Sequence, residues 1–267
     1  MPSTTASDGA RLHYEVHGAG DPVLLIMGLG SNAYGWHRTI PWLAGGYEVI
    51  AFDNRGTGRS DVPPGPYTIT QMAADAGAVL DAVGRERVHV VGASLGGMIA
   101  QRFAIDHRRR VRSLVLVCTT PGGAHATRAT AEVMAALVQG GEDPATAYRR
   151  NAWFLYGLDT RANHSERIEE DLAYRMKIPT QPAGYFGQLQ AAMGHDAWDD
   201  LPSIAVPTLV VHGDADLLVP TPNGKHLAER IPGAQLVLIP GAGHMLQADG
   251  GDVLRDAVLP FLTRAAA

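Results

Sequence analysis

The sequence predicts an α/β fold, a mainly parallel sheet with helices on both faces and one long helical insertion. Short apolar runs rich in β-branched residues alternate with amphipathic segments through residues 1–120 and again through 206–267. Such alternation is typical of a parallel sheet with crossover helices. No strand-like run occurs between these two parts, and a connection that long is not a bare loop. We therefore predict a core of residues 1–120 and 206–267 and a helical cap, or lid, of residues 121–205.

Composition and charge are those of a globular protein and argue against a nucleic-acid-binding or membrane-spanning protein. The 267 residues are 46% hydrophobic and 18% charged, as in an ordinary globular enzyme. The net charge of −5 gives no basic face for nucleic acid, and no apolar run approaches the ~18 residues of a membrane span. The first ten residues do not resemble a signal peptide, and the single Cys118 ends an apolar run, as a buried inert thiol does. We expect a cytoplasmic protein that binds a small molecule, with no nucleic acid and no membrane partner. Monomer and homodimer both stay open.

Hydrophobic spacing places the elements of the core. Residues 10–17 alternate loosely, as an edge strand does, whereas residues 23–27 form the wholly apolar run of a central strand. Further strands are predicted at 47–52, 88–91, 111–118, 208–211 and 235–239, and helices around 34–43, 70–83, 98–105, 221–230 and 252–263. Between residues 121 and 205 the spacing predicts only short amphipathic helices broken by Gly and Pro.

The pattern G-x-S-x-G lies between a predicted strand and a predicted helix. Here it reads Gly92-Ala93-Ser94-Leu95-Gly96. A serine in this context lies on a sharp turn that exposes its hydroxyl, and the flanking glycines leave room for the tight turn. The alternative to a nucleophilic serine is a glycine-rich turn in which Ser94 has no catalytic role. A phosphate-binding loop is disfavoured because no Lys-Ser or Lys-Thr pair follows the glycines.

Chemically useful residues follow several other predicted strands. Gly28 and Leu29 follow the second strand, and His244 follows the last one. Ligands bind at the carboxyl ends of parallel strands, so these residues should meet Ser94 at one edge of the sheet. A serine becomes a nucleophile when an imidazole accepts its proton and a carboxylate orients that imidazole. The backbone N–H groups of Leu95 and Leu29 are the expected oxyanion donors.

Four motifs in the right order resemble those of the α/β-hydrolase superfamily over nearly the whole chain. They are Gly92-Ala93-Ser94-Leu95-Gly96-Gly97, Asp53-Asn54-Arg55-Gly56-Thr57-Gly58-Arg59-Ser60, His212-Gly213-Asp214-Ala215-Asp216-Leu217-Leu218-Val219-Pro220 and Gly241-Ala242-Gly243-His244. The chain is similar to small bacterial carboxylesterases, and to 3-oxoadipate enol-lactonases in the second motif and in Gly65-Pro66-Tyr67-Thr68. Many members carry His-Gly where this chain has Met27-Gly28, next to the expected donor Leu29.

The resemblance also selects the acid. Its pattern G-x-x-D-x-x-V-P puts the catalytic carboxylate at Asp216, and Asp214 then caps its own turn. His244 is the expected base. A structural role is expected for His212, whereas His226, between Lys225 and Leu227, is expected on the solvated face of a helix. Asp53 and Arg55 are expected to fix a loop through charged hydrogen bonds.

The cap is expected to select the substrate. It holds eight of the seventeen aromatic residues, and Trp153 and Phe186 are predicted, with Gly28, to contact substrate. The cap has seven basic and eleven acidic side chains, a net charge of −4. We therefore expect neutral esters to be preferred over anionic lactones. If an anion does bind, Arg149 or Arg150 is the expected cation.

The sequence thus predicts a cofactor-independent serine hydrolase of the carboxylesterase or lactonase type. Ser94, Asp216 and His244 would cleave a small to medium carboxylic ester through an acyl-enzyme, with no cofactor and no metal. Lactone opening and C–C bond hydrolysis with the same triad stay open. So do a ligand receptor that retains a slow triad, and perhydrolysis or cofactor-free oxygen chemistry.

Overall fold

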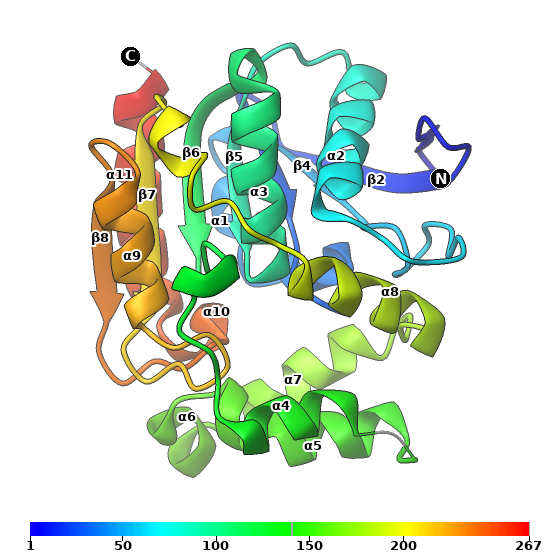
Figure 1. The fold of residues 1–267 in the computed structure, drawn as a ribbon, viewed down its shortest axis with the longest axis vertical. Coiled ribbons are helices and arrows are strands. Elements are labelled where there is room, and N and C mark those ends of the chain that lie inside the picture. Colours follow the sequence, from blue (N-terminus) through cyan, green and yellow to red (C-terminus); the bar gives the residue numbers. More distant parts are fainter. Residues whose placement is uncertain (140, 267) are drawn as a thin grey trace.

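The computed structural model describes residues 1–139 and 141–266 and contains one eight-stranded sheet (Figure 1). Its order is β1-β2-β4-β3-β5-β6-β7-β8; β2 runs antiparallel to its two neighbours, and all pairs from β4 to β8 are parallel. The strands are β1 (Ser3–Thr5), β2 (Arg11–His17), β3 (Asp21–Ile26), β4 (Tyr47–Phe52), β5 (Val88–Ala93), β6 (Val111–Val117), β7 (Thr208–Gly213) and β8 (Gln235–Ile239). The predicted α/β-hydrolase fold class is confirmed.

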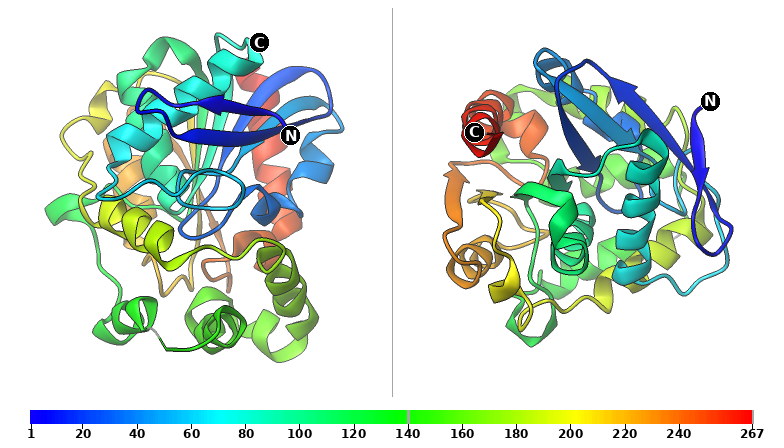
Figure 2. Two further views of the ribbon diagram at one scale, coloured as in Figure 1. Left: turned by 90° about the vertical axis from the view of Figure 1, so that its right-hand side faces the viewer. Right: turned by 90° about the horizontal axis from the view of Figure 1, so that it is seen from above.

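Helices cover both faces of the sheet (Figure 2). Helices α2, α3 and α9 pack on one face, and α1 and α11 pack on the other. Successive strand residues point to opposite faces. Leu24 of β3 therefore packs among α2 and α3, whereas Leu25 packs toward α11. The core helices are α1 (Ile40–Leu43), α2 (Ile69–Val83), α3 (Leu95–Asp106), α9 (Pro222–Arg230), α10 (Leu246–Asp249) and α11 (Gly251–Ala266).

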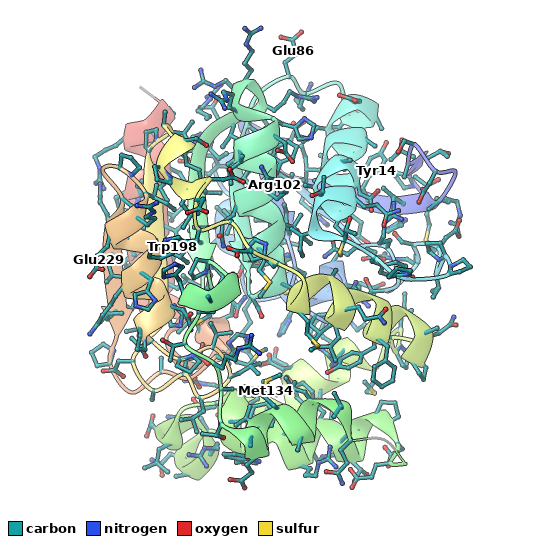
Figure 3. All side chains as sticks on the ribbon, in the orientation of Figure 1. Tyr14, Glu86, Arg102, Met134, Trp198 and Glu229 are labelled. Atoms are coloured by element: carbon teal, nitrogen blue, oxygen red, sulfur yellow. The ribbon has the colours of Figure 1, made fainter. Side chains whose placement is uncertain are left out.

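In the described part of the chain, five α-helices connect β6 to β7 and lie beyond the carboxyl ends of the strands (Figure 1). They are α4 (Ala131–Val138), α5 (Pro144–Leu155), α6 (Leu158–Asn163), α7 (Ser165–Arg175) and α8 (Pro182–Met193). The segment that returns to β7 is held by Arg102 of α3, labelled in Figure 3, whose Nη1 donates to Asp200 at 2.9 Å. The exact division of the chain into core and cap stays a prediction. None of the described helices combines the length and apolar character needed to cross a membrane.

Two predicted elements differ in the structure. Residues 10–17 were expected at the sheet edge, but β1 pairs outside β2 and takes that place. The helix expected at 34–43 is instead a 3₁₀ turn at Ala33–Trp36 and the single turn of α1. Pro41 has no N–H to donate to the preceding turn, so the helix must restart there, with Pro41 in its first turn.

A buried ion pair joins α2 to the loop after β4. Arg55 is 1% exposed, and its Nε and Nη2 donate to Asp75 at 2.5 and 2.6 Å. We expect Asp75→Asn to lower the free energy of unfolding by about 2–3 kcal/mol, because the buried guanidinium loses two charge-assisted hydrogen bonds and keeps only Asp8, at 2.7 Å from its Nη1, as a counter-ion. Asp81→Asn is the control on the same helix, since Asp81 pairs with Arg110 while 69% exposed, and should cost less than about 1 kcal/mol. Urea unfolding of the two variants checks this, and equal losses would contradict it.

Candidate active site

Ser94 lies between β5 and α3 in a backbone conformation that residues other than glycine rarely adopt. Its φ of 56° and ψ of −120° place it at a sharp turn. The turn is held by the Ser94 N–H, which donates to the Val117 carbonyl at 2.9 Å, and by the Thr119 hydroxyl, which donates to the Ser94 carbonyl at 2.7 Å. A Cβ at Gly92 would overlap the Gly96 carbonyl, which explains why glycine is needed beside the serine. These hydrogen bonds and the close packing of Gly92 therefore hold Ser94 in its strained backbone conformation.

Asp216 and His244 meet at the carboxyl ends of β7 and β8. Asp216 is 4% exposed, and its Oδ1 accepts from the backbone N–H groups of Leu218 and Val219, both at 2.9 Å. Its Oδ2 lies 2.8 Å from Nδ1 of His244. A carboxylate accepts at Nδ1–H, and this tautomer leaves Nε2 of His244 able to accept a proton. Within the described part of the chain, the Ser94 hydroxyl has no hydrogen-bond partner, so it is not bonded to His244 here.

His212 packs beside Asp216 and holds the loop that carries it. Its Nε2 donates to the Val219 carbonyl at 2.7 Å and lies 3.5 Å from Oδ2 of Asp216. Burial lowers the pKa of His212, which keeps the imidazole neutral. Asp214 was expected to cap its own turn, but its Oδ1 accepts from the Gly241 N–H at 2.6 Å. It therefore joins the loop after β7 to the loop after β8, and it does not contact His244.

The loop after β3 lies against Ser94. A Cβ at Gly28 would lie 3.1 Å from the Cβ and 3.6 Å from the Oγ of Ser94. The N–H groups of Leu29 and Leu95 donate to no acceptor in residues 1–139 and 141–266. Both are therefore available to an anion formed at Ser94.

Gln188 of α8 bridges two loops of the core and had no signal in the sequence. Its Oε1 accepts from the Gly30 N–H at 2.9 Å, and its Nε2 donates to the Arg55 carbonyl at 2.8 Å. The side chain is fully buried. The Gln188 bridge occupies the Gly30 N–H and fixes the loop that carries Leu29.

Cys118, His212 and Asp216 place their ligand atoms within 4.8 Å of one another. These residues do not fit a metal ion. Complete burial raises the pKa of the Cys118 thiol well above its usual value, which makes it an inert thiol in the absence of a metal. Nε2 of His212 already donates to the Val219 carbonyl, and Oδ2 of Asp216 already holds His244.

The two cap residues predicted to bind substrate contact other aromatic residues of the cap, and one of them lies at the surface. Phe186 is 46% exposed and packs edge-on against Tyr185, and Trp153 packs edge-on against Phe154. Neither contact involves Ser94 or His244, and a substrate-binding role for both residues stays a prediction.

The two arginines expected to bind an anion are already paired. Arg149 bonds Glu169 at 2.6 Å on the surface, and Arg150 lies 3.1 Å from Glu142. Neither is the free cation that the sequence suggested.

Comparisons with known proteins agree with this architecture. The family model described as the alpha/beta hydrolase fold matches residues 21–251. The chain is 34% identical to a proposed carbamate hydrolase, RutD, of Azorhizobium caulinodans over 98% of both chains. Among solved structures, it resembles a thermophilic esterase from Thermogutta terrifontis (28% identity, TM-score 0.84, 100% and 99% of the two chains) and an enol-lactonase from Burkholderia xenovorans (25%, 0.85, 98% and 100%). The chain belongs to the α/β-hydrolase family.

Proposed function

We propose that this protein is a serine hydrolase that cleaves a small to medium carboxylic ester or lactone. The observation that carries the proposal is the 2.8 Å hydrogen bond between His244 and Asp216, at the same edge of the sheet as the strained Ser94 turn. An imidazole oriented by a buried carboxylate and a serine exposed on a sharp turn are the groups that acyl transfer requires.

The proposed reaction has two halves. His244 Nε2 takes the Ser94 proton while Oγ attacks the substrate carbonyl, and the N–H groups of Leu29 and Leu95 stabilise the oxyanion. His244 then gives the proton to the leaving alkoxide, and the C–O bond breaks. Water, activated by the same imidazole, hydrolyses the acyl-enzyme. Asp216 keeps the Nδ1–H tautomer and stabilises the imidazolium in both halves.

The relatives support the hydrolase class. Esters and enol-lactones are both cleaved by attack on an acyl carbon, so one triad serves both types of bond. The cap of residues 121–205 would enclose the substrate above the strand ends, as pockets between two layers of structure do.

A panel of esters, lactones and β-diketones, with product analysis, tests the proposal. Multiple turnovers on simple esters or lactones support it. C–C cleavage of the diketones alone would replace it with a C–C hydrolase. Tight ligand binding with almost no turnover would instead indicate a receptor.

The Gln188 bridge gives a prediction at this site. We expect Gln188→Ala to lower kcat about tenfold with little change in KM, because the loop that carries Leu29 loses its fixed position. Gln190→Ala on the exposed side of α8 is the matched control and should leave kcat unchanged. Steady-state kinetics on one ester check this. A rise in KM alone would assign Gln188 to substrate binding instead.

A further inference from the structure

Arg175, the last residue of α7, reaches from the cap to the loop after β3. A Cβ at Gly30 would lie 2.8 Å from Nη2 of Arg175. Gly30 is two residues from Gly28, at most about 7 Å along the chain, and Gly28 lies against Ser94. The guanidinium therefore lies beside the same loop that contacts the proposed nucleophile.

Arg175 is half-buried and is not paired with an acid of residues 1–139 or 141–266. Within the described part of the chain, no carboxylate lies within 4 Å of its guanidinium, which is instead 5.6 Å from the centre of the Tyr148 ring. Arg149 and Arg150, by contrast, are both paired with acids. A partly desolvated guanidinium without a carboxylate partner is suited to bind one from a ligand, because its planar fork forms two parallel charge-assisted hydrogen bonds.

A small cavity adjoins this guanidinium. Its volume is about 30 Å³, and its walls include Ser31, two residues beyond Leu29, and Met245, next to His244. A cavity of this size holds roughly two waters, which is the space that the two oxygens of a carboxylate require. Arg175 and this cavity thus lie between the chain segments that follow the proposed oxyanion donor and the proposed base.

Asp171 also borders the cavity, but its charge is balanced. Its Oδ1 accepts from Arg38 Nε at 2.9 Å, and its Oδ2 accepts from the Tyr156 hydroxyl at 2.9 Å. His37 Nε2 lies a further 3.2 Å from Oδ1. The carboxylate is therefore occupied by core and cap partners, and Arg175 keeps its capacity for an external anion.

Hydrogen bonds hold the Gly30 loop, which Arg175 contacts, against the cap. Gln188 accepts from the Gly30 N–H, and the Thr180 hydroxyl donates to the Gly30 carbonyl, both at 2.9 Å. Both backbone groups of Gly30 are thus bound to the cap segment that follows Arg175. The loop beside Arg175 is therefore held in place before a ligand binds, so ordering this loop adds little entropy cost to binding.

We propose that Arg175 binds an ionised carboxylate of the substrate, so that the site favours monoesters of dicarboxylic acids or lactones that carry a carboxylate. The inference rests on the proposed function and specifies its substrate class. It reverses the preference for neutral esters expected from the net charge of the cap. The repulsion from the net charge of the cap is long-ranged, and salt screens it beyond a Debye length of about 8–10 Å. A bidentate ion pair in a half-buried site is screened much less.

The test compares two methyl esters of equal shape, monomethyl succinate and methyl isocaproate, in which an isopropyl group replaces the carboxylate. We expect the wild type to favour monomethyl succinate by tenfold or more in kcat/KM, and Arg175→Met to reduce this ratio about 10- to 100-fold, mainly through KM. Arg175→Lys should keep part of the preference, because it keeps the charge but loses the fork. Arg149→Met removes an exposed paired arginine of the same cap and should leave the ratio unchanged. A wild-type ratio near one, or a ratio that Arg175→Met does not change, overturns the inference.

Binding separates this inference from the proposed function. In the Ser94→Ala background, calorimetry should show monomethyl succinate binding at least tenfold more weakly when Arg175 is also methionine. If no ester is turned over but this difference in binding remains, the proposed function fails and the carboxylate site stands. If both esters are turned over by a Ser94-dependent route with equal ratios in wild type and Arg175→Met, the function stands and the carboxylate site fails.

Discussion

Ser94→Ala is expected to lower kcat/KM for ester hydrolysis by about 10⁴-fold or more, with no loss of folded protein. The hydroxyl is the proposed nucleophile, and without it the remaining groups provide only binding and oxyanion stabilisation. Alanine keeps the Cβ of serine at φ 56° and keeps every backbone hydrogen bond of the turn, so the fold should persist. Hydrolysis of a responsive ester and the thermal unfolding midpoint are the two measurements.

The matched control for this change is Ser203→Ala, an exposed serine in the 3₁₀ turn Leu201–Ser203. It should have wild-type activity. Ester hydrolysis by Ser94→Ala near the wild-type rate would rule out the proposed mechanism, whatever the substrate.

Asp216→Asn is expected to lower kcat by about 10³–10⁴-fold, and Asp214→Asn by less than about threefold. An amide at 216 no longer stabilises the imidazolium and permits the wrong histidine tautomer. At 214 an amide oxygen can still accept from the Gly241 N–H, which is the hydrogen bond that this side chain makes. Steady-state kinetics of both variants on one ester check the ranking. The reverse ranking would move the acid to Asp214.

Sequence reasoning reached the fold because buried parallel strands carry nearly continuous apolar runs that alternate with amphipathic helices. It missed β1 because Ser3-Thr4-Thr5 has no hydrophobic alternation; the strand forms by pairing with the open side of β2. It placed one helix across Pro41, where the missing N–H divides the segment into two short turns.

The proposed active-site residues lie in local motifs, and the structure joins His244 to Asp216 as those motifs suggest. Their catalytic roles stay predictions until they are tested. Gln188 and Arg175 could not be found in this way. Gln188 contacts Gly30, which is 158 positions away in the sequence. The proposed role of Arg175 depends on its contact with the Gly30 loop and on the pairing of nearby acids with other arginines. Such contacts are set by tertiary packing, which spacing alone does not encode.

The hydrogen bonds from the cap to Gly30 have a consequence for solvent exchange. The Gly30 amide proton is held by a side chain of α8 and not by the sheet, so it can reach water only when α8 separates from the loop. Its deuterium uptake should therefore follow the opening of the cap, whereas amides of β3 itself exchange only with unfolding of the core. One backbone position would then record how often the site is exposed to water, in the absence of any ligand.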